Sequence, residues 1–285
     1  MARLMSPVER SREIGPLWHL AEGLQFIREN VDPQLLRLDF EALPQARELW
    51  TTFTRREAEV GAALTAAVAS VAAAFRRGEW APDAFRSSWE ALGFAPHEEG
   101  GGTPADDYLD ALCQVSRLTL GEPRPPAGNL NMASRAQQIA EFLEMTRPGP
   151  ADLVIDLGSG SGKLALTVAA SSLARVRGIE YGKSYVAAAR RSADFLGLQN
   201  LAFVHADVRD VELSEGTIFF LYYPFHGEVA RAVAQTLGRL GEGRQITLCL
   251  RGPSNDFADH FLAQGSLSVV ERRGEFSETL VLRSG

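Results

Sequence analysis

Residues 153–163 read Leu-Val-Ile-Asp-Leu-Gly-Ser-Gly-Ser-Gly-Lys, and this stretch decides the fold of the chain. An apolar run that ends in a cluster of glycines predicts a short buried strand, a tight turn and the start of a helix. Such a turn presents backbone N–H groups to a nucleotide-like ligand. Glycines at positions 158, 160 and 162 would let the backbone approach that ligand where a Cβ would collide. The stretch therefore predicts a nucleotide-binding α/β domain.

Two well-known nucleotide motifs do not fit these residues. The phosphate-binding loop needs Gly-x-x-x-x-Gly-Lys-Ser/Thr, and Leu157 and Leu164 stand where its first glycine and its hydroxyl would be. The dinucleotide fingerprint needs Gly-x-Gly-x-x-Gly, and Lys163 stands at its third glycine. What remains is an acidic residue at the strand end followed by Gly-x-Gly-x-Gly.

Downstream of this motif, strand and helix patterns alternate. Helices are expected at 163–172, 183–197 and 227–240, and further strands at 175–180, 201–205, 217–222 and 244–250. Short strands separated by helices of this length predict parallel βαβ units. The end of the chain breaks that rhythm, because the strands expected at 267–271 and 278–282 flank Arg272-Arg273-Gly274 and form a hairpin pair. The predicted fold class is α/β, with a seven-stranded, mainly parallel sheet and an antiparallel terminal hairpin.

The N-terminal part of the chain reads as a helical module. One apolar stripe predicts a helix of about 20 residues, because its members recur at steps of three and four: Val60, Leu64, Val68, Val71 and Phe75. A second helix is expected at 83–92, and residues 98–104 are expected to form a flexible loop. The Pro- and Gly-rich segment 121–128 reads as a linker or an ordered loop. We therefore divide the chain into a module at 1–128 and an α/β domain at 129–285, whose first helix would begin at a capping box of Ser134 and Gln137.

The residues of the α/β part resemble the class I S-adenosylmethionine (AdoMet) dependent methyltransferases over roughly residues 130–285. The likeness rests on the acidic residue before Gly-x-Gly-x-Gly and on the acidic end of the second predicted strand, Gly178-Ile179-Glu180. Among subfamilies, these residues look most like the histone lysine methyltransferases of the telomeric-silencing-disruptor type and their bacterial relatives. The resemblance implies AdoMet as cofactor and S-adenosylhomocysteine as its product.

The resemblance also implies which residues hold the cofactor. The glycine turn would contribute Gly158, Ser159, Gly160 and Gly162, with Asp156 near the methionine amine. Glu180 stands 18 residues after Gly162 and would accept both ribose hydroxyls, as the acidic residue does in dinucleotide sites.

The adenine would lie near three further residues, each of which also has a structural interpretation. Tyr181 would lie against the ring or simply pack. Asp207 resembles the family residue that accepts from the adenine amino group, with the Val208 backbone beside it, and it is otherwise a turn or cap aspartate. Glu180 itself is otherwise a solvated carboxylate at a strand end.

Candidate catalytic residues follow the fourth predicted strand. Tyr222, Tyr223 and His226 would lie in the crevice at the carboxyl edge of the sheet, where such folds bind substrates. The Asn-Pro-Pro-Tyr or Asp-Pro-Pro-Tyr sequence of many amine and amide methyltransferases is absent. These side chains would align the acceptor or take its proton. In the alternative interpretation the aromatic residues pack and His226 begins the next helix. No metal is expected, since carboxylates and histidines do not cluster at familiar ligand spacings.

Composition narrows the expected location and partners. Two distant cysteines and an N-terminus without an apolar signal core predict a cytoplasmic protein with reduced thiols, and no membrane span is expected. The net charge is −7, and neither part shows a basic stripe, which argues against nucleic acid and leaves a small molecule or a protein as the expected acceptor. The helical module would complete the acceptor pocket or form a homodimer contact. Two alternatives remain open, namely a catalytically silent AdoMet-binding scaffold and a non-methylating enzyme acting on a small metabolite.

Overall fold

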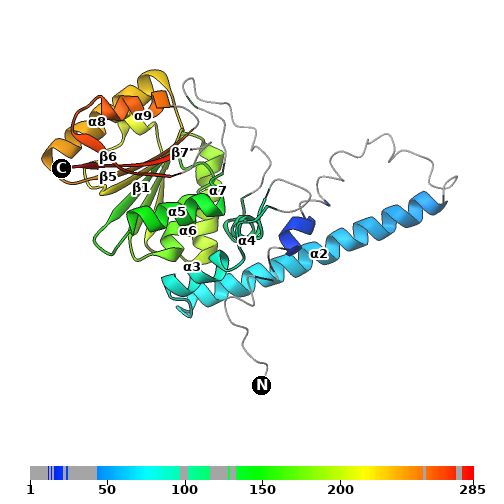
Figure 1. The fold of residues 1–285 in the computed structure, drawn as a ribbon. Helices are drawn as coiled ribbons and strands as arrows, with labels where there is room; N and C mark the ends of the chain where they lie inside the picture. The colour runs from blue at the N-terminus through cyan, green and yellow to red at the C-terminus, as the bar shows by residue number, and fades with distance from the viewer. Residues whose placement is uncertain are drawn as a thin grey trace.

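The structure, a computed structural model, describes residues 44–96, 102–115, 133–252, 255–273 and 278–285, together with residues 12, 14, 16–21, 24 and 128. Its centre is a seven-stranded sheet in the order β3-β2-β1-β4-β5-β7-β6 (Figure 1). The strands are β1 (Leu153–Leu157), β2 (Arg175–Glu180), β3 (Leu201–His205), β4 (Ile218–Tyr222), β5 (Thr247–Gly252), β6 (Leu267–Arg273) and β7 (Glu278–Ser284).

The strand directions confirm the predicted fold class. Strands β1 to β5 pair in parallel, whereas β7 lies antiparallel between β5 and β6. The hairpin expected at the end of the chain is therefore present, and its second strand inserts beside β5. Because the chain reverses its strand order between β1 and β4, the carboxyl ends of these two strands flank the crevice where open α/β sheets bind ligands.

Helices cover both faces of the sheet (Figure 1). One face packs on α5 (Ala136–Thr146), α6 (Lys163–Ser171) and α7 (Lys183–Leu196), and the other on α8 (Gly227–Gly243) and α9 (Asn255–Leu262). The sequence predicted all of these except α9, an eight-residue helix that is too short for a clear apolar period.

The N-terminal helices add a third layer outside α6 and α7. These are α2 (Pro44–Arg76), α3 (Pro82–Glu90) and α4 (Pro104–Cys113), of which α3 and α4 contact α6, and α2 and α4 contact α7. The fully buried Trp89 and Tyr108 belong to the same apolar cluster as Val154 and Phe220 of the sheet. The module and the α/β domain thus share one hydrophobic core.

Helix α2 is longer than predicted, and its first half extends away from the rest of the molecule (Figure 1). Within the described residues, Trp50–Arg76 is the segment long and apolar enough to cross a bilayer by length and composition alone. A helix that packs in a protein core can be equally long and apolar. Part of the predicted apolar stripe of α2 packs in this way, since Val68 and Val71 are buried in the shared core.

Two helix starts differ from the predictions. Thr103 caps α4 by accepting from the Asp106 N–H at 3.1 Å, so the end of the expected 98–104 loop belongs to a helix start; residues 98–101 lie outside the described residues. The capping box of α5 is one residue later than predicted, because Gln138 rather than Gln137 accepts from the Arg135 N–H at 2.9 Å. The expected linker at 121–128 also lies outside the described residues except for Gly128.

A buried cation joins α4 to the glycine turn. Lys163, the residue after Gly162, is 4 % exposed, and its Nζ lies 3.1 Å from Asp106 Oδ1 and 2.8 Å from Asp110 Oδ1. Asp106 Oδ1 also accepts from the backbone N–H of Ala136, the first residue of α5, at 2.6 Å. One carboxylate of the N-terminal module therefore contacts the first turns of both α5 and α6.

Burial and charge act in opposite directions on this cluster. Burial alone would lower the pKa of Lys163, but Asp110 and Asp106 outweigh it and raise that pKa. Burial likewise opposes ionisation of Asp106, yet Lys163 and the hydrogen bonds from Ala136 and Thr103 lower its pKa. The charges of Lys163 and Asp106 therefore support one another, and Asp110 adds to the stabilisation of the lysine.

Replacing Lys163 by methionine should lower the free energy of unfolding by about 3–5 kcal/mol, because two buried carboxylates lose their cation. The matched control is Lys183→Met, which removes the other lysine of the chain at an exposed position of α7 and should change stability by about 0.5 kcal/mol or less. Urea denaturation followed by circular dichroism measures both variants. Equal stability of the two variants would show that the buried cluster does not hold α4 to the turn.

Candidate functional site

The glycine turn is fastened to the end of β2 by its own backbone. The N–H groups of Gly158 and Ser159 both donate to the Ile179 carbonyl, at 2.8 and 3.0 Å. The Gly160 N–H donates to Glu180 Oε2 at 2.9 Å. The prediction that these groups are presented to a ligand is therefore wrong for three of them, because they form the link between β1 and β2.

Two of the glycines are required by contacts inside the protein. Gly158 has φ +79°, and a Cβ there would lie 2.3 Å from Pro224 Cβ in the loop after β4. Gly162 has φ +86°, and its Cβ would lie 2.6 Å from the ring of Phe203 in β3. A side chain at either position would thus collide with Pro224 or with Phe203, which gives these two glycines a structural reason of their own.

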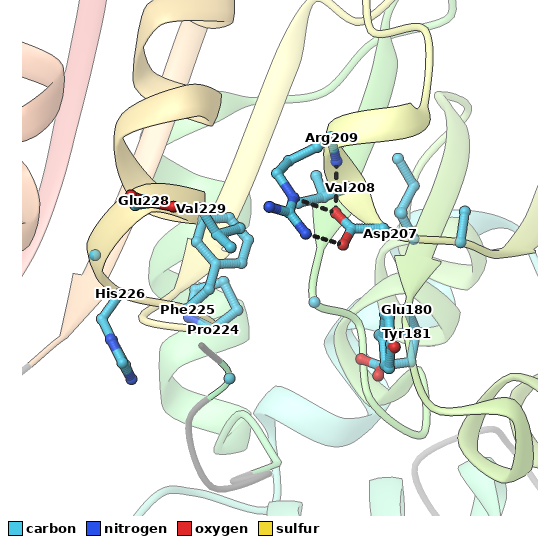
Figure 2. A pocket seen from close by; sticks show the side chains of 15 residues that line it. Glu180, Tyr181, Asp207, Val208, Arg209, Pro224, Phe225, His226, Glu228 and Val229 are labelled. Atoms are coloured by element: carbon cyan, nitrogen blue, oxygen red, sulfur yellow. Dashed lines mark hydrogen bonds and ion pairs between the residues drawn. The ribbon is translucent and has the colours of Figure 1, made fainter. Parts of the chain in front are cut away.

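A cavity of about 480 Å³ opens at the carboxyl ends of β1, β2, β3 and β4 (Figure 2). Six of the predicted site residues line it, namely Gly158, Glu180, Tyr181, Asp207, Val208 and His226. The residues that the sequence interpretation did not assign to the site are Gly128, Ile179, Ala206, Arg209, Pro224, Phe225, Gly227, Glu228 and Val229. Most of them adjoin an assigned motif in the sequence, so widening each motif by one or two residues would have found them.

Glu180 is fixed at the tip of β2. Its Oε2 accepts from the Gly160 N–H, and its Oε1 accepts from the Gly182 N–H at 2.7 Å. Each carboxylate oxygen can accept more than one hydrogen bond, so both oxygens keep acceptor capacity, and Glu180 lines the cavity. Tyr181, which follows, is 50 % exposed and lines the same cavity. The structure thus presents Glu180 in a form that can accept two hydroxyl groups.

Asp207 lies across the cavity rim from Glu180, at the end of β3 (Figure 2). It caps the short helix η2 (Val208–Asp210), accepting from the Arg209 N–H at 2.9 Å. The Arg209 side chain holds both carboxylate oxygens, with Nε 3.0 Å from Oδ1 and Nη2 2.6 Å from Oδ2. These bonds lower the pKa of Asp207. The cap interpretation is therefore correct, and it is compatible with a ligand contact because Asp207 also lines the cavity.

The opposite wall of the cavity combines apolar and polar side chains. Phe225, just before α8, and Val229, in its first turn, face the side chains at the ends of β2 and β3 across the open space, and His226 and Glu228 lie beside them (Figure 2). Acceptors at two strand tips and apolar side chains opposite them match the hydroxyls and the base of a nucleoside. Gly128 adds a backbone contact from the N-terminal side, through a β-bridge to Phe225.

Asp156 lies beneath the cavity. It is 4 % exposed within β1 and is not among the residues that line the cavity. Burial, with the charge of Glu180, raises the pKa of Asp156 to about 8. Ser159 also turns inward, and its buried Oγ has no hydrogen-bond partner among the described residues. Any contact of these two residues with a ligand would require an intervening water or a shift of the turn.

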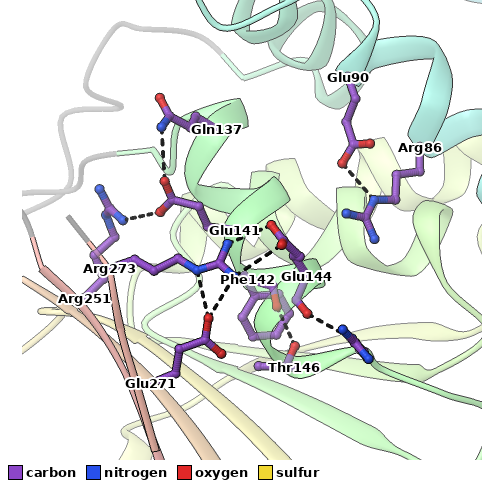
Figure 3. A network of polar contacts seen from close by, with 11 residues as sticks. Arg86, Glu90, Gln137, Glu141, Phe142, Glu144, Thr146, Arg251, Glu271 and Arg273 are labelled. Atoms are coloured by element: carbon purple, nitrogen blue, oxygen red, sulfur yellow. Dashed lines mark hydrogen bonds and ion pairs between the residues drawn. The ribbon is translucent and has the colours of Figure 1, made fainter.

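Tyr222 is held on the α5 side of the sheet. Its hydroxyl accepts from Gln138 Nε2 at 3.4 Å, and the Arg251 guanidinium lies 5.9 Å from its ring centroid. Arg251 in turn pairs with Glu141 of α5 at 3.1 Å, within a network of ion pairs that also joins Arg273 to Glu144 (Figure 3). Tyr222 is thus fixed between α5 and β5, outside the cavity lining.

Tyr223 and His226 lie on the other side. Tyr223 has φ +37°, a strained conformation for a bulky residue, and its ring packs edge-on against Phe257 of α9 at 5.2 Å. His226 is exposed, precedes the first residue of α8 and lines the cavity. Of the three candidate catalytic residues, His226 alone lines the cavity. Tyr223 packs against an aromatic neighbour, as the alternative interpretation of the sequence predicted.

The strand order, the antiparallel β7 and the cavity at the carboxyl edge define the class I methyltransferase fold. Residues 154–239 match the family profile described as a methyltransferase domain. The chain therefore carries a methyltransferase domain, and AdoMet is the cofactor of this class.

Similarity to named proteins covers part of the chain. The chain is 33 % identical over 79 residues to the 23S rRNA (uracil(1939)-C(5))-methyltransferase RlmD of Marinomonas sp. (strain MWYL1), and it spans 18 % of that protein's length. Among solved structures, an RNA methyltransferase from Salinibacter ruber in complex with S-adenosyl-L-homocysteine matches 54 % of this chain and 92 % of its own, with 23 % identity and a TM-score of 0.42. The precorrin-6y C5,15-methyltransferase from Geobacter metallireducens GS-15 matches 55 % of this chain and 92 % of its own, with 13 % identity and a TM-score of 0.43.

The expectation that argued against nucleic acid is wrong. The curated relative is named for its action on 23S rRNA, which conflicts with that exclusion. The physical reason is that net charge and sequence runs do not describe a surface. Arginines far apart in the sequence can gather on one face without forming a basic stripe in the chain.

Asp156→Asn should stabilise the protein as the pH rises. Between about pH 4 and the raised pKa of about 8, the folded Asp156 keeps a proton that the unfolded chain releases, so the wild-type protein loses stability through this window. Asparagine does not titrate, and the gain of the variant over wild type should grow from pH 5 to pH 8.5. Thermal or urea unfolding at both pH values measures it, with the exposed Asp194→Asn as control. A gain that does not change with pH would contradict the raised pKa.

Proposed function

We propose that this protein transfers a methyl group from AdoMet to an acceptor bound at the carboxyl edge of the sheet. The observation that carries the proposal is the charge of the cavity. Among the described residues that line it are three carboxylates, Glu180, Asp207 and Glu228, and one arginine, Arg209. AdoMet has a net positive charge, whereas mononucleotides and dinucleotides bring phosphates, which such a lining would repel.

In this proposal the residues divide the cofactor between them. Glu180 accepts the two ribose hydroxyls, and Asp207 accepts from the amino group of adenine. Val208, Phe225 and Tyr181 cover the faces of the base. Asp156 acts near the methionine amine through the turn. Gly158, Ser159, Gly160 and Gly162 hold β1 and β2 in the register that positions Glu180.

Chemistry at the site demands alignment more than activation. Bound AdoMet supplies a methyl group on a sulfonium sulfur that leaves as a neutral thioether. The protein must hold the acceptor in line and exclude water. His226 is our first candidate to accept a proton from the acceptor, since it lines the cavity. Tyr222 would orient the acceptor from the α5 side, and Tyr223 would fix the conformation of the loop between β4 and α8.

RNA is the acceptor class that we propose to test first, because the curated relative is named for 23S rRNA. Methylation of a pyrimidine carbon needs a nucleophile that first adds to the ring. Burial raises the pKa of both thiols, Cys113 and Cys249, to about 12, and neither residue lines the cavity. We therefore infer a nitrogen or oxygen acceptor whose own lone pair attacks the methyl group.

Three finer assignments accompany this proposal. The core would be related to the bacterial relatives of the telomeric-silencing-disruptor methyltransferases. The division at 128/129 would separate a bracing module from the AdoMet-binding part. The location would be cytoplasmic, which the two unpaired cysteines support.

Glu180→Gln should weaken AdoMet binding by about 10- to 100-fold, since hydrogen bonds to a charged group contribute about 1.5–3 kcal/mol. Titration calorimetry with AdoMet measures the loss, and Glu242→Gln, an exposed change on α8, is the control. Transfer of labelled methyl to RNA, protein and small-molecule fractions of an extract then tests catalysis. Binding without transfer to any fraction would favour the silent scaffold, and an unchanged dissociation constant would remove Glu180 from the site.

The variants His226→Ala, Tyr222→Phe and Tyr223→Phe separate catalysis from cofactor binding. If His226 takes a proton in the transition state, its variant should lose turnover while AdoMet affinity stays within a few-fold. Steady-state kinetics with the acceptor fraction identified above, together with calorimetry, measures the two effects. Full turnover in all three variants would assign proton removal to the acceptor or to solvent.

A further inference from the structure

The cavity wall contains an arginine for which the proposed function has no role. Arg209 is half exposed and lines the cavity, and its guanidinium extends beside the Asp207 carboxylate toward the open space (Figure 2). Its backbone N–H and its Nε both donate to Asp207 Oδ1, and its Nη2 donates to Oδ2. The role of Asp207 as helix cap needs only the bond from the Arg209 backbone N–H. The two further bonds from the Arg209 side chain are not explained by capping.

These three bonds leave Asp207 with limited capacity for a ligand. A carboxylate has about four acceptor positions. Oδ1 already accepts two hydrogen bonds and Oδ2 accepts one, so the position that remains lies on Oδ2. That position suits one N–H donor.

Asp207 lies at a cavity that other charged and titratable groups also line. Asp210 follows in the same short helix, Glu180 faces the cavity from β2, and Glu228 and His226 line it from the start of α8. Without Arg209, the pKa of Asp207 would rise, and its carboxylate would lose the two side-chain bonds that fix its orientation. A carboxyl group that takes up a proton as the pH falls donates as well as accepts, and it would then also accommodate a carbonyl group.

We propose that Arg209 is a specificity-determining residue, which holds Asp207 as a pure acceptor and so selects a base with an exocyclic amino group over one with a carbonyl group at the same position. The inference rests on the proposed function, since it assumes that the base of the cofactor lies beside Asp207. It adds a selection for adenine over hypoxanthine.

The test compares two ligands that differ in this one group, S-adenosylhomocysteine and its deaminated form, S-inosylhomocysteine. Calorimetry on the full chain should show that the wild-type protein binds the adenine compound about 10- to 100-fold more tightly, the effect of one hydrogen bond to a charged group. In Arg209→Gln the ratio should fall to about threefold or less, through weaker binding of the adenine compound, tighter binding of the other, or both. Arg209→Lys, which keeps the charge, should retain more of the ratio than the glutamine variant.

A pH profile separates this role from a merely structural one. Because Arg209 lowers the pKa of Asp207, its removal should shift the loss of S-adenosylhomocysteine binding in acid to higher pH. Arg239→Gln, which removes an exposed cation at the far end of α8, should change neither the ratio nor the profile. Thermal unfolding confirms that each variant is folded.

The outcomes distinguish the two proposals. If the wild-type protein binds neither compound, the proposed function fails, and this inference fails with it. If the wild-type protein binds S-adenosylhomocysteine but both Arg209 variants keep the wild-type ratio of the two affinities, the inference alone is overturned. Loss of affinity for both compounds by the same factor would also overturn it, because that result describes a structural role.

Discussion

The ion cluster of Lys163, Asp106 and Asp110 is the interaction on which the rest of the site depends. Lys163 directly follows the glycine turn, and its two carboxylate partners come from α4, more than fifty residues earlier in the chain. A buried charge is tolerated only where its partners and hydrogen bonds are complete. Asp106 meets this condition with donors from Lys163, Thr103 and the first residue of α5. The helices that the sequence presents as a separate module therefore form part of the base of the glycine turn.

Hydrogen bonds connect the elements held by this cluster to both sides of the crevice, at the ends of β4 and β2. The start of α5 carries Gln138, which contacts the Tyr222 hydroxyl at the end of β4. The glycine turn binds the tip of β2 and fixes Glu180. A small number of hydrogen bonds thus relates the ribose end of the proposed cofactor site to the side where an acceptor would bind. Such sites depend on side chains whose orientation is set by the groups behind them.

The glycine-rich turn has a different physical role here from that in phosphate sites. Phosphate-binding turns present their backbone N–H groups to the ligand. In this turn, the N–H groups of Gly158, Ser159 and Gly160 bind Ile179 and Glu180 instead. The cavity beside it is lined with carboxylates. The same local geometry would therefore suit a ligand that carries hydroxyls and positive charge, because the turn fixes an acceptor where a phosphate site offers donors.

The sequence by itself determined the sheet, its hairpin and the residues at the strand tips, because apolar periods and glycine turns are local signals that survive in any context. It located Glu180, Asp207 and His226 at the cavity for the same reason, since parallel strands bring their carboxyl ends to one edge. Only the tertiary structure decided that Lys163 is a buried cation, that Arg209 fixes Asp207 and that Tyr222 and Tyr223 lie on opposite sides. These features depend on partners from other elements or on the burial and rotation of a side chain. The pattern of residues along the chain contains neither kind of information.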